Sequence, residues 1–150
     1  VRFWTFCFVW YCKIICGCSY FKNIMTPDTL FFFSKDPAAL PLYEAFEARV
    51  LAEIANVAVK VQKTQITYTN PRVFAAVSFL PVRKKAQRPD HYITVTLGLN
   101  RRLDSPRVDA ASEPYPARWT HHLLLSSPEE ADDELMAWVR EAAAFSAAKR

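Results

Sequence analysis

The distribution of the cysteines constrains this chain more than any other feature of its sequence. The 126 residues from Met25 to Arg150 contain no cysteine, and all four lie within the first eighteen residues, as Cys7, Cys12, Cys16 and Cys18. The body of the chain must therefore fold without disulfides. A body of this length is large enough to bury a hydrophobic core by itself. We expect a single domain over residues 25–150.

Residues 1–24 read differently from the body, because they are crowded with aromatic residues and contain no acid. Three interpretations are open: a secretory or lipoprotein signal with Cys18 as the lipidated residue, a membrane helix, or an extension that is not a natural part of the protein. Lys13 interrupts the apolar run, and no A-x-A-like cleavage site is present, which disfavours the first two. We expect the third. The cysteines form no C-x-x-C pair and have no histidine nearby, so we expect no zinc site.

The net charge of +4 owes much to these first residues. Residues 25–150 contain 16 basic and 15 acidic side chains, so the basic isoelectric point is weak evidence for a nucleic-acid partner. The cysteine-free body fits a reducing compartment, and we expect a cytoplasmic protein with no membrane segment in residues 25–150.

Two helices are predicted near the ends of the body. The first begins at Pro37 to Pro41 and runs to about Ala55, because apolar residues recur there at three- and four-residue steps. We expect Glu44, Glu47 and Arg49 on this helix to be solvated. The second begins at Ser127, where an N-cap serine, Pro128 and an acid three residues on form a helix start. Its predicted buried stripe is Ala131, Leu135, Trp138, Ala142 and Phe145.

The region between the helices is typical of strands. Residues 57–68 predict one kinked strand or two short ones, residues 73–80 a central strand, and residues 91–99 and 119–126 two more. Residues 81–90 predict a basic loop, and the proline-punctuated residues 100–118 are expected to be mostly loop. Short connections favour an antiparallel sheet. We therefore predict an α+β fold, a two-layer sandwich with a mainly antiparallel sheet of four to five strands and both helices on one face.

Four segments resemble a known family: LPLYEAFEARV, VKVQKTQITYTN, FAAVSFLPVRKK and RWTHHLLLSSPEEADDELMAWVREAAAFSA. They are similar to the bacterial domain-of-unknown-function 5655 family over about residues 40–147. The resemblance implies a small cytoplasmic α/β domain with an accessory role that starts near Met25. Since the family is uncharacterised, it implies no reaction, ligand or catalytic residue.

His121 and His122 are the most conspicuous candidates for chemistry. Neighbouring residues on a strand point to opposite faces, so the two rings do not readily share a metal ion. We expect one buried, hydrogen-bonded histidine and one exposed histidine.

Several classes of active site are excluded in their usual forms. The only glycine of the body is Gly98, whereas phosphate loops, dinucleotide fingerprints and the G-x-S-x-G nucleophile elbow all need several. No Asp followed by a Glu-x-Lys strand is present for a metal-dependent nuclease. We expect no catalytic residue, no cofactor and no metal.

The basic middle of the chain carries the leading functional hypothesis. If its cations converge with Tyr68, Tyr92 and Trp119 on the open sheet face, they would track phosphates and stack bases. The simpler interpretation is a solvated loop and scattered surface charges. We expect a non-enzymatic binding module for a nucleic acid, a nucleotide or an acidic metabolite. Its ligand-binding residues would be Lys60, Lys63, Arg83, Lys84, Arg118, Trp119, His121 and His122.

Two other classes of function stay open. One is an enzyme with a histidine and Lys/Arg pocket near Trp119. The other is a protein-interaction domain that binds through Phe31 to Phe33. The oligomeric state is not determined by the sequence.

Overall fold

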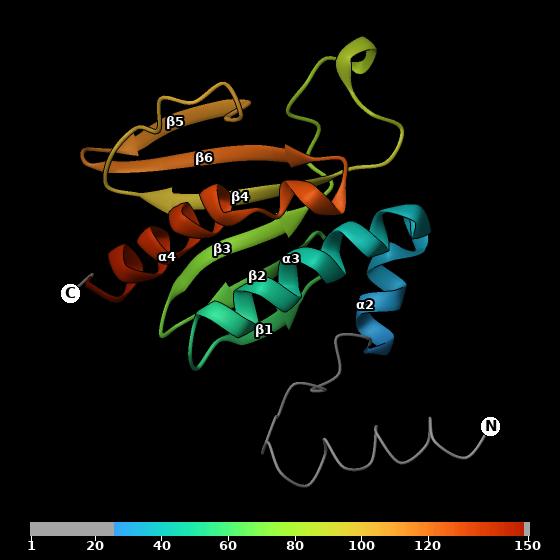
Figure 1. The fold of residues 1–150 in the computed structure, drawn as a ribbon, viewed down its shortest axis with the longest axis horizontal. Coiled ribbons are helices and arrows are strands. Elements are labelled where there is room, and N and C mark those ends of the chain that lie inside the picture. The colour runs from blue at the N-terminus through green and yellow to red at the C-terminus, as the bar shows by residue number, and fades with distance from the viewer. Residues whose placement is uncertain (1–25, 149–150) are drawn as a thin grey trace, which may run out of the picture.

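The computed structural model describes residues 26–148. Figure 1 shows three α-helices and a sheet in this part of the chain. The helices are α2 (Pro27–Phe32), α3 (Leu40–Glu53) and α4 (Asp133–Ala148). The strands are β1 (Ala58–Val61), β2 (Gln65–Thr69), β3 (Val73–Ser78), β4 (Ile93–Leu99), β5 (Ala110–Tyr115) and β6 (Arg118–Leu125). The expectations for residues 1–24, including the four cysteines, lie outside the described residues.

The sheet of the described residues has six strands in the order β1-β2-β3-β4-β6-β5, and all neighbours are antiparallel. The predicted α+β class and antiparallel pairing are confirmed. The predicted count of four to five strands is too low, because residues 110–115 were expected to be loop and instead form β5. This strand contains Pro114 and is mostly exposed, which an edge strand tolerates because its outer side needs no ladder hydrogen bonds.

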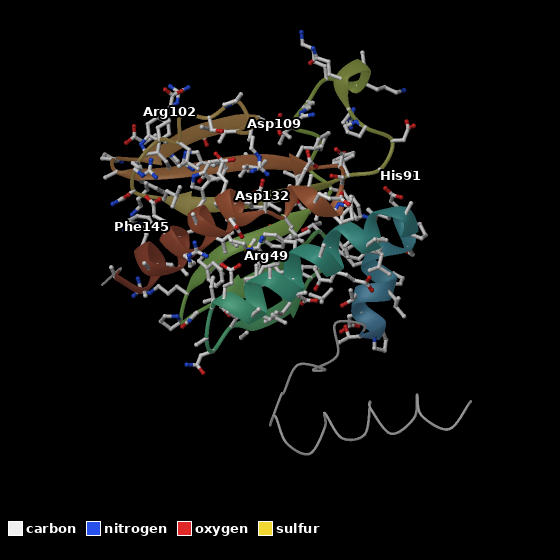
Figure 2. The ribbon with its side chains drawn as sticks, in the orientation of Figure 1. Arg49, His91, Arg102, Asp109, Asp132 and Phe145 are labelled. Carbon is white, nitrogen blue, oxygen red and sulfur yellow. The ribbon has the colours of Figure 1, made fainter. Side chains whose placement is uncertain are left out.

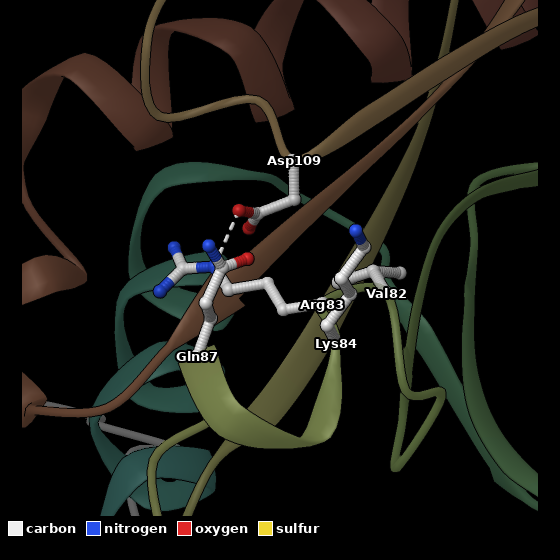
Figure 3. A pocket seen from close by; sticks show the side chains of 5 residues that line it. All are labelled: Val82, Arg83, Lys84, Gln87 and Asp109. Carbon is white, nitrogen blue, oxygen red and sulfur yellow. Dashed lines mark hydrogen bonds and ion pairs between the residues drawn. The ribbon is translucent and has the colours of Figure 1, made fainter.

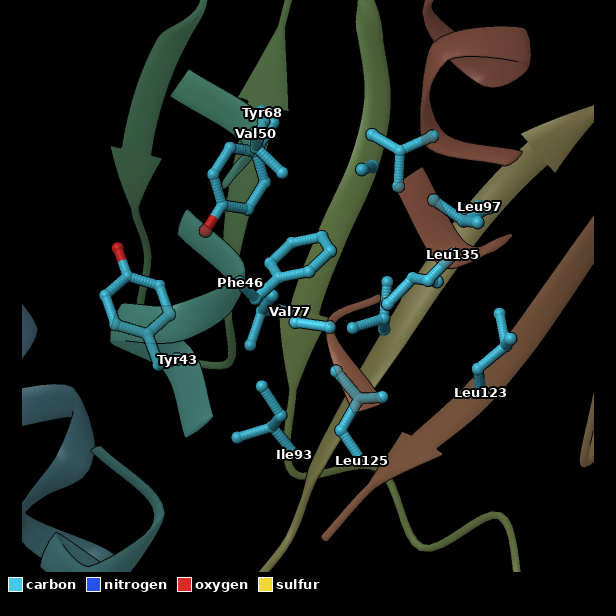
Figure 4. Packing of buried hydrophobic residues seen from close by; sticks show 14 of the residues in the cluster. Tyr43, Phe46, Val50, Tyr68, Val77, Ile93, Leu97, Leu123, Leu125 and Leu135 are labelled. Atoms are coloured by element: carbon cyan, nitrogen blue, oxygen red, sulfur yellow. The ribbon is translucent and has the colours of Figure 1, made fainter. Parts of the chain in front are cut away.

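Helices α3 and α4 lie in front of the sheet in Figure 1, and α4 packs against β3 and β4. The side chains that alternate toward the helices are fully buried, among them Ile66, Val77, Leu97, Leu123 and Leu125. Figure 4 shows Val77, Leu97, Leu123 and Leu125 packed with residues of α3 and α4 such as Phe46 and Leu135. The opposite side of the sheet, here called the open face, carries the other set of alternating residues.

Helix α3 confirms the predicted helix but not the exposure of one of its acids. Glu47 was expected to be solvated, yet its side chain is buried, with 4% exposure, and accepts a hydrogen bond from the Tyr43 hydroxyl at 2.7 Å. Tyr68 of β2 is also fully buried, and neither its hydroxyl nor Glu47 Oε2 has a hydrogen-bond partner among the described residues. The core therefore contains a polar cluster of two tyrosines and a carboxyl group that periodicity did not predict.

The second predicted helix is divided in two. Ser127 forms the expected capping box with Glu130, but it begins a single 3-10 turn, Pro128–Glu130. A new start follows, because Asp132 Oδ1 accepts the Leu135 N–H at 3.0 Å and α4 begins at Asp133. Ala131, Leu135 and Ala142 of the predicted stripe are buried, whereas the chain also buries Met136, Val139, Ala143 and Ser146.

Two arginines, Arg49 and Arg107, join distant segments around α4; Figure 2 labels Arg49 and Asp132, the partner of Arg107. Arg49 of α3 forms ion pairs with Glu53 and Asp133. Arg107, from the segment before β5, contacts Asp132 at 2.8 Å and lies over the Trp138 ring. These contacts fix α4 relative to α3 and to the β4–β5 connection.

Phe31 to Phe33 form part of a short helical segment rather than a loose lead. Phe32 and Phe33 are 5% and 2% exposed and pack on Phe79, whereas Phe31 is 78% exposed. No helix in residues 26–148 has the length and apolar character needed to cross a bilayer.

Candidate anion-binding pocket

A pocket lies where the basic loop after β3 meets the start of β5. It has a volume of about 490 Å³ and is lined by Val82, Arg83, Lys84, Gln87 and Asp109, shown in Figure 3. We call it the loop pocket. Four of its five lining side chains are polar or charged, so it favours a polar or charged ligand over an apolar one.

Asp109 is the fixed point of this pocket. Its N–H donates to the His122 carbonyl at 2.9 Å, and its Oδ2 accepts the Leu124 N–H at 2.8 Å. Both bonds attach it to β6 just before β5 begins. Its other carboxylate oxygen, Oδ1, accepts from Arg83 Nε at 2.5 Å. Both oxygens of the only acid in the lining are therefore engaged, and the carboxylate holds the loop to the sheet.

The basic side chains keep free donors. Among the described residues, the terminal amino groups of Arg83, the Lys84 ammonium and the Gln87 amide form no hydrogen bond. A backbone bond from the Gln87 N–H to the Lys84 carbonyl, 2.9 Å long, closes the turn that carries these side chains. Two cations and one acid leave a formal excess of one positive charge, and oxygen atoms of an anion are the natural acceptors for these donors.

The structure brings only Arg83 and Lys84 of the predicted site residues into this pocket. Lys60 and His122 do share the open face, since consecutive strand partners form one row across it: Lys60, Thr67, Ala76, Thr96, His122 and Ala110. Four strand spacings separate the lysine from the histidine, or about 19 Å at about 4.8 Å each. Lys63, in the β1–β2 turn, and Arg118, at the start of β6, are exposed and lie outside the pocket lining.

His121 is the buried histidine of the pair. It is 0% exposed, pairs with Leu97 across the strands, and its Nε2 accepts the Leu103 N–H at 2.9 Å. Burial lowers the pKa of the His121 imidazole below its usual value, so the ring is neutral at neutral pH. A ring that is enclosed in the core and holds a backbone N–H serves the fold rather than a ligand.

His122 lies on the open face and is only partly buried. Its Nδ1 is 2.9 Å from Thr96 Oγ1, and desolvation lowers the pKa of this ring as well. The expected buried histidine is His121, whereas His122, expected to be exposed, is partly buried on the opposite face. Since the Asp109 N–H donates to the His122 carbonyl, the backbone of His122 lies next to the loop pocket across the strand pairing.

The expected base-stacking surface does not form. Tyr68 is fully buried in the core, and Trp119 lies on the helix-facing side of β6, stacked with His121 at 6.4 Å and covered by Arg102. Tyr92 donates its hydroxyl to the Phe79 carbonyl at 3.3 Å. The condition for base stacking is not met, because strand alternation places Tyr68 and Trp119 on the helix-facing side of the sheet.

Sequence reasoning missed Asp109 and Gln87. No local signal marks Asp109, because it lies in a segment expected to be loop, and its partners Arg83 and Leu124 are 26 and 15 residues away. Gln87 stands in the basic loop that was singled out, but neutral amides were not considered there. Only the pairing of β5 with β6 brings these residues together.

Within residues 26–148, no group of three or more histidine, aspartate, glutamate or cysteine residues is arranged to hold a metal ion. The four cysteines lie outside that range.

Comparisons with known proteins place the chain in a family. Neither a search of the curated proteins nor a search of the solved structures found a match. The model of the family described as Domain of unknown function (DUF5655) matches residues 31–146. That range covers the six strands of the described residues, α3 and most of α4, and it contains every residue that lines the loop pocket. The chain therefore belongs to the DUF5655 family of domains of unknown function.

Proposed function

We propose that this chain is a non-enzymatic binding module for an anionic ligand and that the loop pocket is its binding site. The observation that supports this most directly is the state of Asp109. Its two oxygens are used by Arg83 and by β6, so the acid does not compete with a ligand for the remaining donors. Arg83, Lys84 and Gln87 then offer positive charge and hydrogen-bond donors to one volume of about 490 Å³.

The rigidity of the pocket's base also supports binding. Sites built on strands are positioned more accurately than sites on loops alone, and here the loop is attached to β6 through Asp109. A cysteine-free body is compatible with a reducing compartment, and we propose the cytoplasm as the location.

The enzyme alternative near Trp119 receives less support. Its histidine would be His121, whose Nε2 is occupied by the Leu103 N–H and whose side chain has no exposed surface. The protein-interaction alternative keeps only Phe31 as an exposed member of the three phenylalanines.

A thermal-shift panel with the whole chain tests the proposal. The probes are nucleotides, acidic metabolites and oligonucleotides, each paired with an uncharged analogue. A ligand present at a hundred times its Kd should stabilise the protein by about 2.7 kcal/mol. Two double variants separate the pocket from general charge: Arg83→Gln with Lys84→Gln removes two pocket cations, and Lys60→Gln with Lys63→Gln removes two cations elsewhere.

We expect the shift to vanish in the pocket variant and to persist in the control variant. Equal loss in both would show that binding depends on net charge alone. The absence of a shift with every anionic probe, for an intact and folded chain, would contradict the proposed function.

A further inference from the structure

The orientation of Arg83 within the loop pocket restricts the kind of anion that it can bind. A guanidinium has five N–H donors in a planar fork, and here the Nε edge is directed at Asp109 Oδ1, 2.5 Å away. The two terminal amino groups form no hydrogen bond with any residue of the described range. In Figure 3 they point away from the carboxylate. The two terminal amino groups of Arg83 are therefore left as a pair of parallel donors at the end of the guanidinium.

We propose that the loop pocket recognises the terminal oxyanion of a small acid, a carboxylate or a phosphate, through the two terminal amino groups of Arg83, and that Asp109 is the positioning residue that presents them. This inference rests on the proposed function, because it names the ligand class and the hydrogen-bond donors of the same site.

The positioning role follows from how Asp109 is held. Its backbone N–H and its Oδ2 are both bonded to β6, on either side of Leu123, so the carboxylate has little freedom to move. Side-chain ordering is a main cost of binding, at about 0.5–1.5 kcal/mol for each flexible side chain that is immobilised. Arg83 forms its ion pair with Asp109 without any ligand, so folding already restricts this side chain. Ligand binding therefore loses less side-chain entropy.

Lys84 and Gln87 complete the donor set. Lys84 follows Arg83 directly and supplies a second positive charge, whereas the Gln87 amide supplies neutral N–H donors from the turn that carries it. A planar carboxylate or one face of a phosphate accepts two parallel hydrogen bonds from an arginine, while a lysine acts on it as a point charge.

Two observations favour a small acid over a nucleic-acid strand. Among residues 26–148, no aromatic side chain lines the pocket, so bases would find no stacking partner there. The same part of the chain contributes two cations to the lining, and Lys60 lies on the strand at the other edge of the sheet from β5. If a nucleic-acid strand contacted these two cations alone, its binding constant would depend only weakly on salt. A plot of the logarithm of that constant against the logarithm of the salt concentration would have a slope of no more than about 2 in magnitude.

The decisive variant is Arg83→Lys, which keeps the charge and removes the fork. A single ammonium cannot hold Asp109 and also offer two parallel donors to a ligand. Isothermal titration of the whole chain with inorganic phosphate, a phosphate monoester and succinate should give at least a tenfold weaker Kd for this variant. Lys84→Arg, the matched exchange in the same pocket, should change the Kd less than threefold. The comparison of phosphate with succinate distinguishes the two kinds of oxyanion.

Asp109→Asn tests the positioning role. The asparagine has one acceptor oxygen where the carboxylate has two, so either Arg83 or the Leu124 N–H loses its partner. In ¹⁵N spectra of the original chain, phosphate should move the terminal N–H signals of Arg83 and leave its Nε–H signal in place. In Asp109→Asn, the Nε–H signal itself should change before ligand is added, and affinity should fall at least fivefold, with the melting curve showing that the variant is folded.

The possible results separate the two proposals. Equal affinity of Arg83→Lys and the original chain would overturn the inference and leave the proposed function intact. Binding of an oligonucleotide with a slope much steeper than about 2, and no binding of the small acids, would have the same consequence. No binding of any anion to the folded chain would remove both.

Discussion

Replacing Glu47 by glutamine should remove most of the pH dependence that the core imposes on stability. The Glu47 side chain is 4% exposed, its Oε1 accepts from the Tyr43 hydroxyl, and its Oε2 has no partner among the described residues. Burial raises the pKa of this carboxyl from its usual 4.5 to about 7; the bond from Tyr43 opposes the change, and the charge of Glu44 adds to it.

The direction of the effect follows from proton linkage. Because the folded-state pKa is the higher one, the folded protein binds more protons than the unfolded chain between pH 4.5 and about 7. The contribution of Glu47 to stability is therefore fully present below pH 4.5, falls as the pH rises through this interval, and levels off above it. At about 1.4 kcal/mol for each unit of pKa, the loss amounts to about 3 kcal/mol.

The assay is urea unfolding of the original chain and of Glu47→Gln at pH 5, 6, 7 and 8. Glutamine is neutral throughout and still offers an oxygen to the Tyr43 hydroxyl. We expect the variant to gain about 2.5 kcal/mol relative to the original chain between pH 5 and pH 8. His121 and His122 also titrate with lowered pKa values, but they are present in both proteins and cancel in the difference.

The control is Glu129→Gln, which removes an exposed carboxylate from the turn before α4. The quantity to compare is the difference in free energy of unfolding between Glu47→Gln and the original chain. A change in this difference of less than about 1 kcal/mol from pH 5 to pH 8 would refute the reasoning. A ¹³C titration of the Glu47 carboxyl provides an independent measurement, and its midpoint should lie near pH 7.

Four further substitutions test the packing, each by urea unfolding and thermal melting. Gly98→Ala should stabilise the protein by about 0.4–1 kcal/mol, since an added Cβ meets no atom within 4 Å; a loss of stability would contradict the open space above β4. Phe33→Ala should cost about 3–5 kcal/mol and Phe31→Ala less than about 0.5, because the two rings are 2% and 78% exposed; similar losses would show that the segment is not docked as described. His121→Phe should cost about 1–3 kcal/mol by leaving the buried Leu103 N–H without its acceptor, and it should speed hydrogen exchange of that amide; unchanged exchange would exclude the bond.

Local patterns predicted most of the secondary structure correctly, since the signals that define those elements lie within a few residues. The apolar spacing that begins near Leu40 predicted α3, and the branched and aromatic run of residues 91–99 predicted β4. The helix start at Ser127 was predicted as well, but the second start at Asp132 was not. The capping box of Ser127 closes after one turn, and Arg107 holds Asp132 from a segment 25 residues away.

The candidate site was predictable only in part. The basic loop was recognised from its composition, and it does contribute Arg83 and Lys84 to a pocket. The remaining predicted residues are distributed over both faces of the sheet and the β1–β2 turn. Charge and aromatic content along a chain do not specify which side chains meet, because strand order and alternation decide that.

The sequence by itself determined a cysteine-free α+β domain and the membership of its family, since composition, helix periodicity and characteristic segments are properties of neighbouring residues. The tertiary structure alone decided that Glu47 is buried, that His121 holds the Leu103 N–H, and that Asp109 meets Arg83. Each of these depends on contacts between segments far apart in the chain. Such contacts form when the whole sheet closes against its helices, and the energy that favours them belongs to that packing rather than to any local segment.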